Sequence, residues 1–215
     1  MIHRVLEWLF PPKCILCRDI LAKEETDLCR RCRTDQPEYH YGKKKVPHVG
    51  DLTAVWRYEG QVRKSLHRYK FGSARHYAAA YGRLLAMKLR QQDPEGFEVL
   101  TWIPVSRLRK IRRGYDQVEL LARAVGRELD MEPVSALKKV RHNRQQSRIV
   151  EPARRRANVL GVYQVTEPEL VRGKRVLLLD DILTTGATAA EAGRVLLTAG
   201  AKEVHCAAVA AARKR

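Results

Sequence analysis

The chain has 215 residues, of which 45% are hydrophobic, and its 42 Lys and Arg against 24 Asp and Glu give a net charge of +18. This length is enough to bury a substantial core and suits one α/β domain with a small appendage. The sequence contains no apolar stretch of membrane-spanning length, and the N-terminal residues lack a small-residue cleavage site. We therefore expect a cytoplasmic protein and no membrane span.

Two CxxC pairs lie close together near the N-terminus: Cys14 and Cys17, then Cys29 and Cys32. Two such turns joined by a short linker supply the four thiolates of a tetrahedral zinc site. Disulfides are the main alternative, but a reducing cytoplasm disfavours them, and a redox site would need only one pair. We predict a structural zinc module over residues 1–45, which should draw much of its folding energy from the metal because so short a segment has little core.

Beyond this module, a polar linker with turn residues (42–50) leads into alternating strand-like and helix-like segments. The expected strands are Leu52–Tyr58, Val99–Val105 and Val204–Ala210, the last with Cys206 as a buried core thiol. The expected helices are one that follows Gly60 and stops at Gly72, then Ala78–Leu89 and Tyr115–Leu129. Strands joined by crossover helices are the parts of a doubly wound parallel sheet.

Positive charge concentrates in residues 101–160, which hold 15 Lys or Arg against 6 Asp or Glu. Five of these basic residues crowd one expected loop, residues 104–117, which follows the strand at Val99. The stretch predicts an electropositive surface that could attract a polyphosphate, a nucleic acid or both. For most individual arginines, a solvated helix face is the simpler interpretation.

The most informative segment reads RVLLLDDILTTGAT, residues 175–188. An aliphatic strand, Val176–Leu179, is followed by Asp180 and Asp181 at its carboxyl end, where open α/β sheets bind ligands. Because side chains alternate along a strand, we expect only one of the two carboxylates to face a ligand squarely.

A loop of threonine and glycine then leads into the expected helix Ala187–Ala199, which Gly200 should end. The helix N-terminus and the loop amides suit a phosphate. An ordinary capped turn between strand and helix is the plain alternative, but the complete run of strand, DD, TTGAT and helix makes it less convincing.

This run closely resembles the phosphoribosyl pyrophosphate motif of type I phosphoribosyltransferases. The resemblance implies that Asp180 and Asp181 meet the ribose hydroxyls and serve as the catalytic carboxylates, with magnesium bound beside the phosphoribosyl pyrophosphate. It implies further binding residues in two loops. The 5′-phosphate would be wrapped by Thr184, Thr185, Gly186, Ala187 and Thr188, and the pyrophosphate would be bound by Val105, Ser106 and Arg107.

A narrower resemblance covers almost the whole chain. The opening PPKCILC, the second CxxC pair, IPVSRLRKIRRGYDQ, RHNRQQSRIVEPARRRANVLGVYQV and DDILTTGAT together look like the ComF family. Asp116 stands where the family's RGFNQ segment has Asn, so a contact that needs an amide donor there would be lost. Gln146, Arg155 and Asn158 match the segment that in type I transferases includes a mobile flap. By this resemblance the fold is a type I phosphoribosyltransferase-like α/β parallel sheet flanked by helices.

The resemblance divides the chain into an N-terminal zinc-binding module with four cysteine ligands (1–45) and a phosphoribosyltransferase-like domain (46–215), with a hood near 50–98 and a core near 99–212. In the hood, Lys70, Phe71 and Gly72 are candidate site residues, although a snorkelling lysine beside a core aromatic is the better-supported interpretation.

Two functions follow from these observations. One is a magnesium-dependent phosphoribosyltransferase, a pentosyl-transferring glycosyltransferase whose acceptor the sequence does not identify, linked to natural competence and DNA uptake. The other is a single-stranded DNA-binding competence factor whose pocket senses a nucleotide without catalysis, with Tyr115 and the nearby arginines on the DNA. Other competence proteins are further candidate partners.

Overall fold

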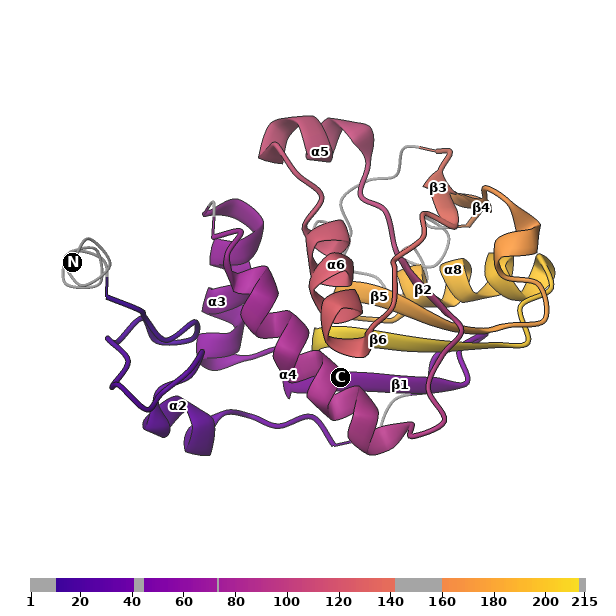
Figure 1. Ribbon diagram of the computed structural model, residues 1–215. Helices are drawn as coiled ribbons and strands as arrows, with labels where there is room; N and C mark the ends of the chain where they lie inside the picture. The colour runs from indigo at the N-terminus through magenta and orange to yellow at the C-terminus, as the bar shows by residue number, and fades with distance from the viewer. Residues whose placement is uncertain (1–10, 41–44, 73, 142–159, 213–215) are drawn as a thin grey trace.

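The computed structural model of the protein describes residues 11–40, 45–72, 74–141 and 160–212. Its centre is a four-stranded parallel sheet in the order β1-β6-β5-β2 (Figure 1). The strands are β1 (Asp51–Arg57), β2 (Val99–Trp102), β5 (Arg175–Leu183) and β6 (Glu203–Ala211). Because all four run in one direction, their carboxyl ends meet at one edge of the sheet, the carboxyl edge, and their first residues meet at the opposite amino edge.

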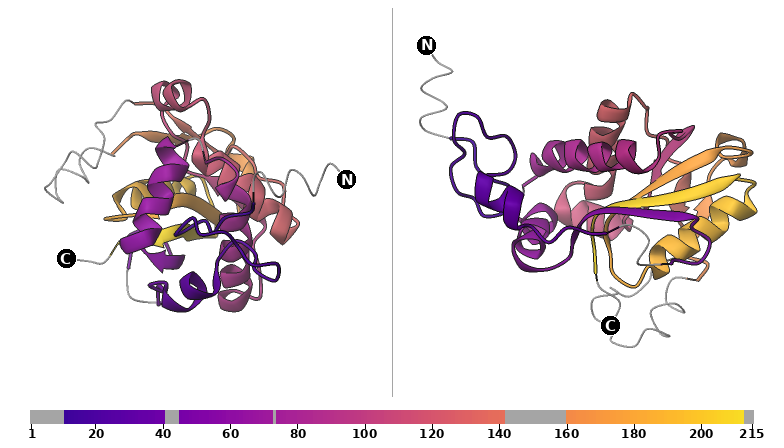
Figure 2. Two further views of the ribbon diagram at one scale, coloured as in Figure 1. Left: turned by 90° about the vertical axis from the view of Figure 1, so that its left-hand side faces the viewer. Right: turned by 90° about the horizontal axis from the view of Figure 1, so that it is seen from below.

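Helices cover both faces of the sheet, as predicted. One face packs against α4 (Tyr77–Gln92) and α6 (Gln117–Leu129), and the other against α8 (Ala187–Thr198) (Figure 2). The central strand β5 accordingly carries the fully buried apolar run 176–179, which is typical of a parallel strand that is covered on both faces.

The remaining elements surround this core. They are α2 (Arg30–Asp35), α3 (Gly60–Phe71), α5 (Arg107–Arg113), the antiparallel pair β3 (Leu137–Lys139) and β4 (Tyr163–Val165), and the 3-10 turn η2 (Pro168–Leu170). Within the described ranges, no helix has both the length and the apolar character that crossing a bilayer requires.

The cysteine-rich module lies at one end of the molecule and packs on α3 (Figure 1). Ser65 donates a short hydrogen bond to the carbonyl of Ile15, and the Arg68 guanidinium donates to the carbonyls of Ile15 (3.0 Å) and Leu16 (2.6 Å). Both carbonyls lie inside the first CxxC turn, so side chains of α3 hold that turn in place through hydrogen bonds.

The second half of the predicted linker also packs on the core. Val46 is buried and lies 2.8 Å from the position a Cβ would take at Gly186, and the carbonyl of His48 approaches Gly193 of α8 even more closely. Only glycine fits at these two close approaches.

The structure confirms the predicted helices and strands but moves several boundaries. The strand expected at Val99–Val105, which is β2, ends at Trp102. The strand β5 extends to Leu183 and therefore includes both aspartates. The expected arginine loop was wrong in part, because its middle forms α5. Ser106 caps the start of α5, and Gly114, with φ of +74°, ends it.

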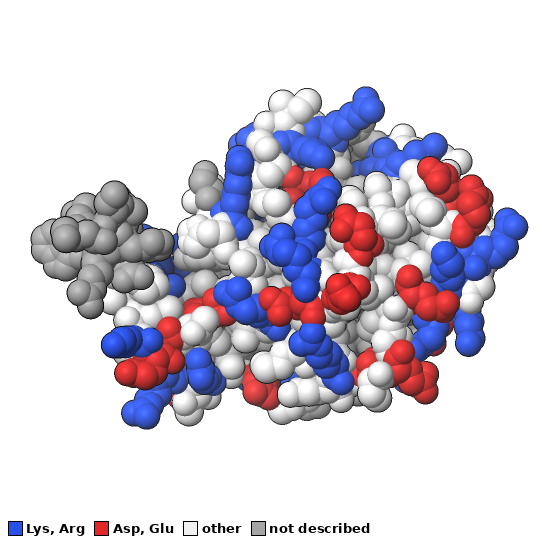
Figure 3. Space-filling model, viewed as in Figure 1, with Lys and Arg blue, Asp and Glu red and all other residues white. Residues whose placement is uncertain are grey.

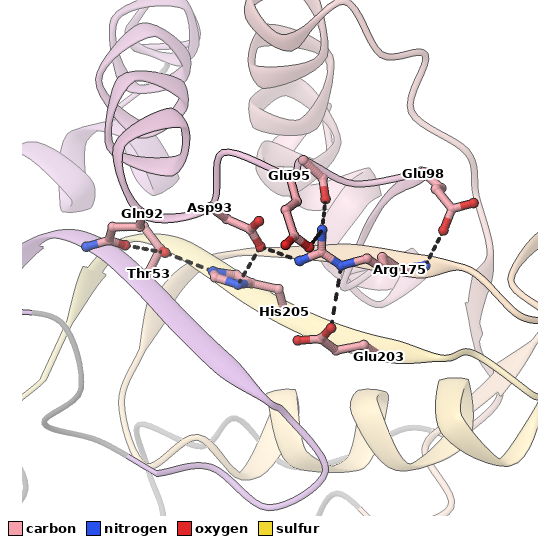
Figure 4. Close-up of polar contacts among 9 residues, drawn as sticks. Thr53, Gln92, Asp93, Glu95, Glu98, Arg175, Glu203 and His205 are labelled. Atoms are coloured by element: carbon pink, nitrogen blue, oxygen red, sulfur yellow. Dashed lines mark hydrogen bonds and ion pairs between the residues drawn. The ribbon is translucent and has the colours of Figure 1, made fainter.

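The amino edge carries a dense polar network around Arg175 (Figure 4). The guanidinium lies 2.7 Å from Asp93 and 3.5 Å from each of Glu95 and Glu203, and it donates to the Gly96 carbonyl at 2.5 Å. This mostly buried cation therefore has a partner for most of its donors, which anchors the loop after α4 to the start of β5 and β6.

His205 sits inside the same edge and is 2% exposed. Its Nε2 lies 2.8 Å from the Thr53 hydroxyl, which donates to Gln92 at 2.6 Å, and its Nδ1 lies 3.9 Å from Asp93 (Figure 4). Since Thr53 gives its only proton to Gln92, the Nε2 of His205 is the donor in this pair. Burial lowers the pKa of His205, so the ring is neutral at pH 7.

Candidate functional site

Asp180 and Asp181 lie near the carboxyl end of β5 and point to opposite faces of the sheet. Asp181 is 4% exposed. Its Oδ1 is 2.8 Å from the Lys70 ammonium of α3, and its Oδ2 accepts a hydrogen bond from Gln117 Nε2 of α6 at 2.9 Å. Asp181 therefore links α3 and α6 to the central strand.

Asp180 is half-buried, and its Oδ1 accepts the backbone N–H of Asp181 at 2.8 Å. Burial, followed by the negative charge of Asp181, raises the pKa of Asp180 to about 8. A cation that binds at Asp180 would favour the ionised form of this carboxyl group.

Tyr163 of β4 and Lys139 of β3 lie on the Asp180 side. Burial and then the charge of Asp180 raise the pKa of Tyr163, while burial and the nearby Arg109 lower the pKa of Lys139 to about 8. The Lys139 ammonium is 5.7 Å from the centre of the Tyr163 ring. The antiparallel pair β3 and β4 thus places the Tyr163 phenol near Asp180 and the Lys139 ammonium beside the phenol ring.

The threonine loop joins β5 to α8 at the same edge. Thr184 is exposed, Thr185 and Thr188 are half-buried, and the Thr185 hydroxyl accepts the Ala187 N–H at 3.3 Å. Gly186, with φ of +83°, is the N-cap of α8. The first amides of a twelve-residue helix therefore open onto the edge that holds the two aspartates, which is the geometry of an anion site.

The proposed pyrophosphate residues lie at the start of α5. The Val105 N–H donates to Asp116 Oδ2 at 3.1 Å, the buried Ser106 hydroxyl accepts the Arg109 N–H at 3.4 Å, and Arg107 is exposed. In this arrangement the Val105 amide is engaged by Asp116, and the Ser106 side chain serves as a helix cap.

The contacts of Asp116 show whether this position needs the amide donor of an Asn. It accepts three backbone N–H groups, those of Val105, Val118 and Glu119, and caps α6. Each of these three contacts needs an acceptor, so a carboxylate serves here as well as an amide oxygen.

A basic surface covers α5. Arg107, Arg109, Lys110, Arg112 and Arg113 lie on this helix without an acidic neighbour in it, and two apolar side chains, Leu108 and Ile111, are also exposed. Lys and Arg side chains gather at this top end of the molecule (Figure 3). The predicted electropositive surface is therefore present along α5.

The aromatic residues of this region differ from expectation. Tyr115 is 8% exposed, and its hydroxyl donates to the Tyr69 carbonyl at 2.5 Å, so its predicted contact with DNA is wrong. Phe71, expected in the core, is instead 53% exposed, and the Arg113 guanidinium stacks 4.7 Å from its ring centre. Lys70 does not snorkel to solvent but pairs with Asp181.

The donor sets differ for the two expected metals. Within the described ranges, the only group of three or more His, Cys, Asp or Glu placed to hold an ion is the cysteine cluster. Magnesium commonly binds through one or two carboxylates while ligand phosphates and waters complete its shell. Asp180 and Asp181 fit such a shared site and do not form a metal cage of their own.

The cysteine cluster fits zinc. The sulfurs of Cys14, Cys17, Cys29 and Cys32 all lie within 4.8 Å of one another. Burial raises the pKa of Cys14, but backbone N–H groups outweigh it and set the pKa at about 7, whereas burial and the neighbouring thiols raise the pKa of Cys32. Since the four thiols cannot ionise together unaided, a divalent cation is what this donor set requires.

Three roles were missed from the sequence. Gln117 belongs to the RGYDQ motif, but its contact with Asp181 joins a helix to a strand and leaves no mark in the local sequence. Lys139 and Tyr163 lie on two short strands that a long segment separates, so their proximity was not predictable either. Among the residues that contact the two aspartates, Lys70 was the one that the sequence indicated, because it lies near the glycine that ends its helix. Gln146, Arg155 and Asn158 of the expected flap lie outside the described residues.

Comparisons with known proteins agree with this architecture. A model of the phosphoribosyl transferase domain matches residues 116–215, and a model of the double zinc ribbon domain matches residues 5–42. The chain is 30% identical to the DNA utilization protein YhgH of Escherichia coli O157:H7, over 91% of this chain and 95% of that protein. It is 26% identical to Competence protein F of Haemophilus influenzae (90% and 94%) and 29% identical to Competence protein ComFC of Bacillus subtilis (87% and 78%).

Proposed function

The chain belongs to the ComF family, and we propose that it binds phosphoribosyl pyrophosphate with magnesium at the carboxyl edge of its sheet, in the service of DNA uptake. The carrying observation is that two adjacent carboxylates and the N-terminus of α8 share this edge inside a phosphoribosyltransferase domain. The link to DNA uptake rests on relatives named for competence and DNA utilization.

The roles follow from the placement of the residues. Asp180 and Asp181 accept the ribose hydroxyls, and the loop Thr184–Thr188 with the first amides of α8 holds the 5′-phosphate. The segment Val105–Arg107 and the basic side chains of α5 attract the pyrophosphate. Magnesium, when bound, neutralises charge on the phosphate oxygens.

If the bound ligand reacts, the reaction is pentosyl transfer. The bond between C1 of the ribose and the pyrophosphate oxygen breaks, the electron pair leaves with pyrophosphate, and a nucleophile forms the new bond to C1. Positioning and charge stabilisation can drive such a step without a protein nucleophile. We propose a cytoplasmic site of action, where the four zinc-binding thiols stay reduced.

Isothermal titration calorimetry tests the binding step. The wild-type protein should bind phosphoribosyl pyrophosphate in the presence of magnesium, and Asp180→Asn combined with Asp181→Asn should lose at least about 100-fold in affinity, since two carboxylate contacts disappear. The exposed pair Asp130→Asn and Glu132→Gln is the matched control with the same replacement of two carboxyl groups by amides. Equal affinity in both double variants would refute the assigned site.

A second candidate function is the binding of single-stranded DNA along α5, favoured by the five basic side chains and the exposed Leu108 and Ile111. Backbone phosphates bind such a surface with a strong salt dependence. Neutralising Arg109, Arg112 and Arg113 should weaken binding and flatten its salt dependence, whereas neutralising Arg63, Lys64 and Lys202 should have little effect. Absence of binding at low salt would exclude this function.

A further inference from the structure

We propose that Lys70 is a cation exchanged during ligand binding: its ammonium pairs with Asp181 in the ligand-free protein and moves to the pyrophosphate group when phosphoribosyl pyrophosphate binds. This inference rests on the proposed function and adds to it a binding residue from α3. It also gives a physical reason why a lysine from the hood reaches the central strand.

Both oxygens of Asp181 already have partners, Lys70 Nζ at 2.8 Å and Gln117 Nε2 at 2.9 Å. A sugar hydroxyl or an ion that approaches Asp181 therefore competes with one of these partners. Lys70 is the partner that can leave, because its flexible side chain is 20% exposed at the last turn of α3, whereas Gln117 is 3% exposed in the first turn of α6.

The buried amide beside Asp181 indicates where a ligand group would enter. Gln117 Oε1 is buried, and it has no hydrogen-bond partner within the part of the chain that the structure describes. A buried acceptor without a donor costs free energy, and one ribose hydroxyl would satisfy it by donating to it, while the neighbouring hydroxyl donates to Asp181. This orphaned acceptor is independent of the Lys70 contact and points to the same position.

The backbone around this position is held firmly, so side-chain exchange does not require the helices to move. The Tyr69 hydroxyl donates to the Gln117 carbonyl at 2.5 Å, and the Tyr115 hydroxyl donates to the Tyr69 carbonyl at 2.5 Å. These bonds tie α3 to the start of α6 next to Lys70. The lysine stem can therefore rotate while its Cα stays in place.

The destination of the ammonium follows from the face on which Asp181 lies. Arg113 stacks on Phe71, the neighbour of Lys70, and burial lowers the pKa of Arg113 while the charge of Asp181 opposes this shift. These residues adjoin α5 and the segment before it, which is the proposed pyrophosphate side. Once a ligand takes Asp181, a mostly buried ammonium needs another anion, and pyrophosphate is the anion on this face.

Two ligands separate this role from simple neutralisation of a buried carboxylate. Phosphoribosyl pyrophosphate and ribose 5-phosphate share the sugar and the 5′-phosphate, but only the first carries pyrophosphate. Affinities with magnesium should be measured by calorimetry for the wild type, Lys70→Met, Lys70→Arg and the control Lys64→Met, an exposed lysine of the same helix. Circular dichroism and thermal unfolding check the fold of each variant.

We expect Lys70→Met to weaken phosphoribosyl pyrophosphate binding by roughly 10- to 100-fold, the usual size of a charged hydrogen bond. Ribose 5-phosphate should bind within about threefold of the wild type or more tightly, because the competing ammonium is gone. Lys70→Arg should retain most of the pyrophosphate-dependent affinity, and Lys64→Met should match the wild type. Lys70→Gln, whose amide can still donate to Asp181, replaces the Met variant if that variant does not fold.

Equal loss for both ligands would overturn the inference in favour of a structural ion pair, and so would unchanged binding of both. If the wild type binds neither sugar phosphate, the proposed function fails and this inference fails with it. Wild-type binding combined with an insensitive Lys70 would remove only the inference.

Discussion

The two edges of the sheet use charge in opposite ways. At the amino edge, Arg175 is surrounded by three carboxylates and a carbonyl, so its charge is matched by its neighbours. At the carboxyl edge, Lys70 pairs with Asp181, while burial and then the charge of Asp181 raise the pKa of the adjacent Asp180. Matched charges thus stabilise the amino edge. The carboxyl edge holds a carboxyl group whose ionisation is unfavourable, as expected of a binding site.

Removal of zinc should have the largest effect on the folded structure. This effect should extend to the carboxyl edge of the sheet and leave the amino edge unchanged. Structural zinc sites supply most of the folding free energy of small modules, and the module rests on α3, which carries Lys70. We expect a chelator to expose the amides of 11–40 to rapid hydrogen exchange and to loosen α3. The amides around Arg175 should stay protected. Loss of protection at both edges together would show that the sheet does not separate them.

Arg175→Met tests the amino edge. Removing the cation leaves Asp93 mostly buried without its closest charged partner, so we expect a loss of about 3 kcal/mol in the free energy of unfolding. Urea denaturation measures this loss. Calorimetry on the folded variant should give wild-type affinity for phosphoribosyl pyrophosphate, and a large loss of affinity would contradict a purely structural role.

Asp180→Asn tests the carboxyl edge in the opposite direction. The folded protein holds the Asp180 proton up to a pKa of about 8, whereas an unfolded carboxyl releases it near pH 4, so wild-type stability falls as the pH rises through this window. The variant lacks this penalty and should be more stable by roughly 1 kcal/mol at pH 8, with a smaller gain at pH 5. A variant that is less stable at pH 8 would contradict the strained edge.

His205→Gln should have the smallest effect. Burial lowers the pKa of His205 although Asp51, Asp93 and Glu203 oppose this shift and Arg175 adds to it. The unfolded chain therefore binds a proton near pH 6.5 that the folded protein takes up only at lower pH, and stability falls as the pH drops below this value. The variant should flatten this fall by up to about 1 kcal/mol between pH 7 and 5. Parallel unfolding curves for both proteins would exclude His205 as a source of acid sensitivity.

The sequence predicted the features that local spacing encodes. The two CxxC pairs and the order of strand, aspartates and threonine loop are each contained in a short segment, and the structure places them as one cluster and one sheet edge. Contacts between distant segments were not predictable in this way. Lys70, Gln117 and Asp181 come from α3, α6 and β5, and only the folded chain brings them together.

Charge and aromatic character misled the prediction where packing decides the outcome. The run of arginines in 104–117 indicated a loop, although Ser106 and Gly114 are sound helix boundaries, and the structure forms α5 between them. Tyr115 is buried because its hydroxyl can donate to a buried carbonyl. Phe71 is exposed because it lies beyond the packed face of α3.

A crystal structure of the protein with magnesium and phosphoribosyl pyrophosphate tests the central claim most directly. We expect ribose hydroxyls within hydrogen-bond distance of Asp180 and Asp181, the 5′-phosphate at Thr184–Thr188, and the Lys70 ammonium on the pyrophosphate. A ligand bound elsewhere, with Asp181 still paired to Lys70, would contradict it.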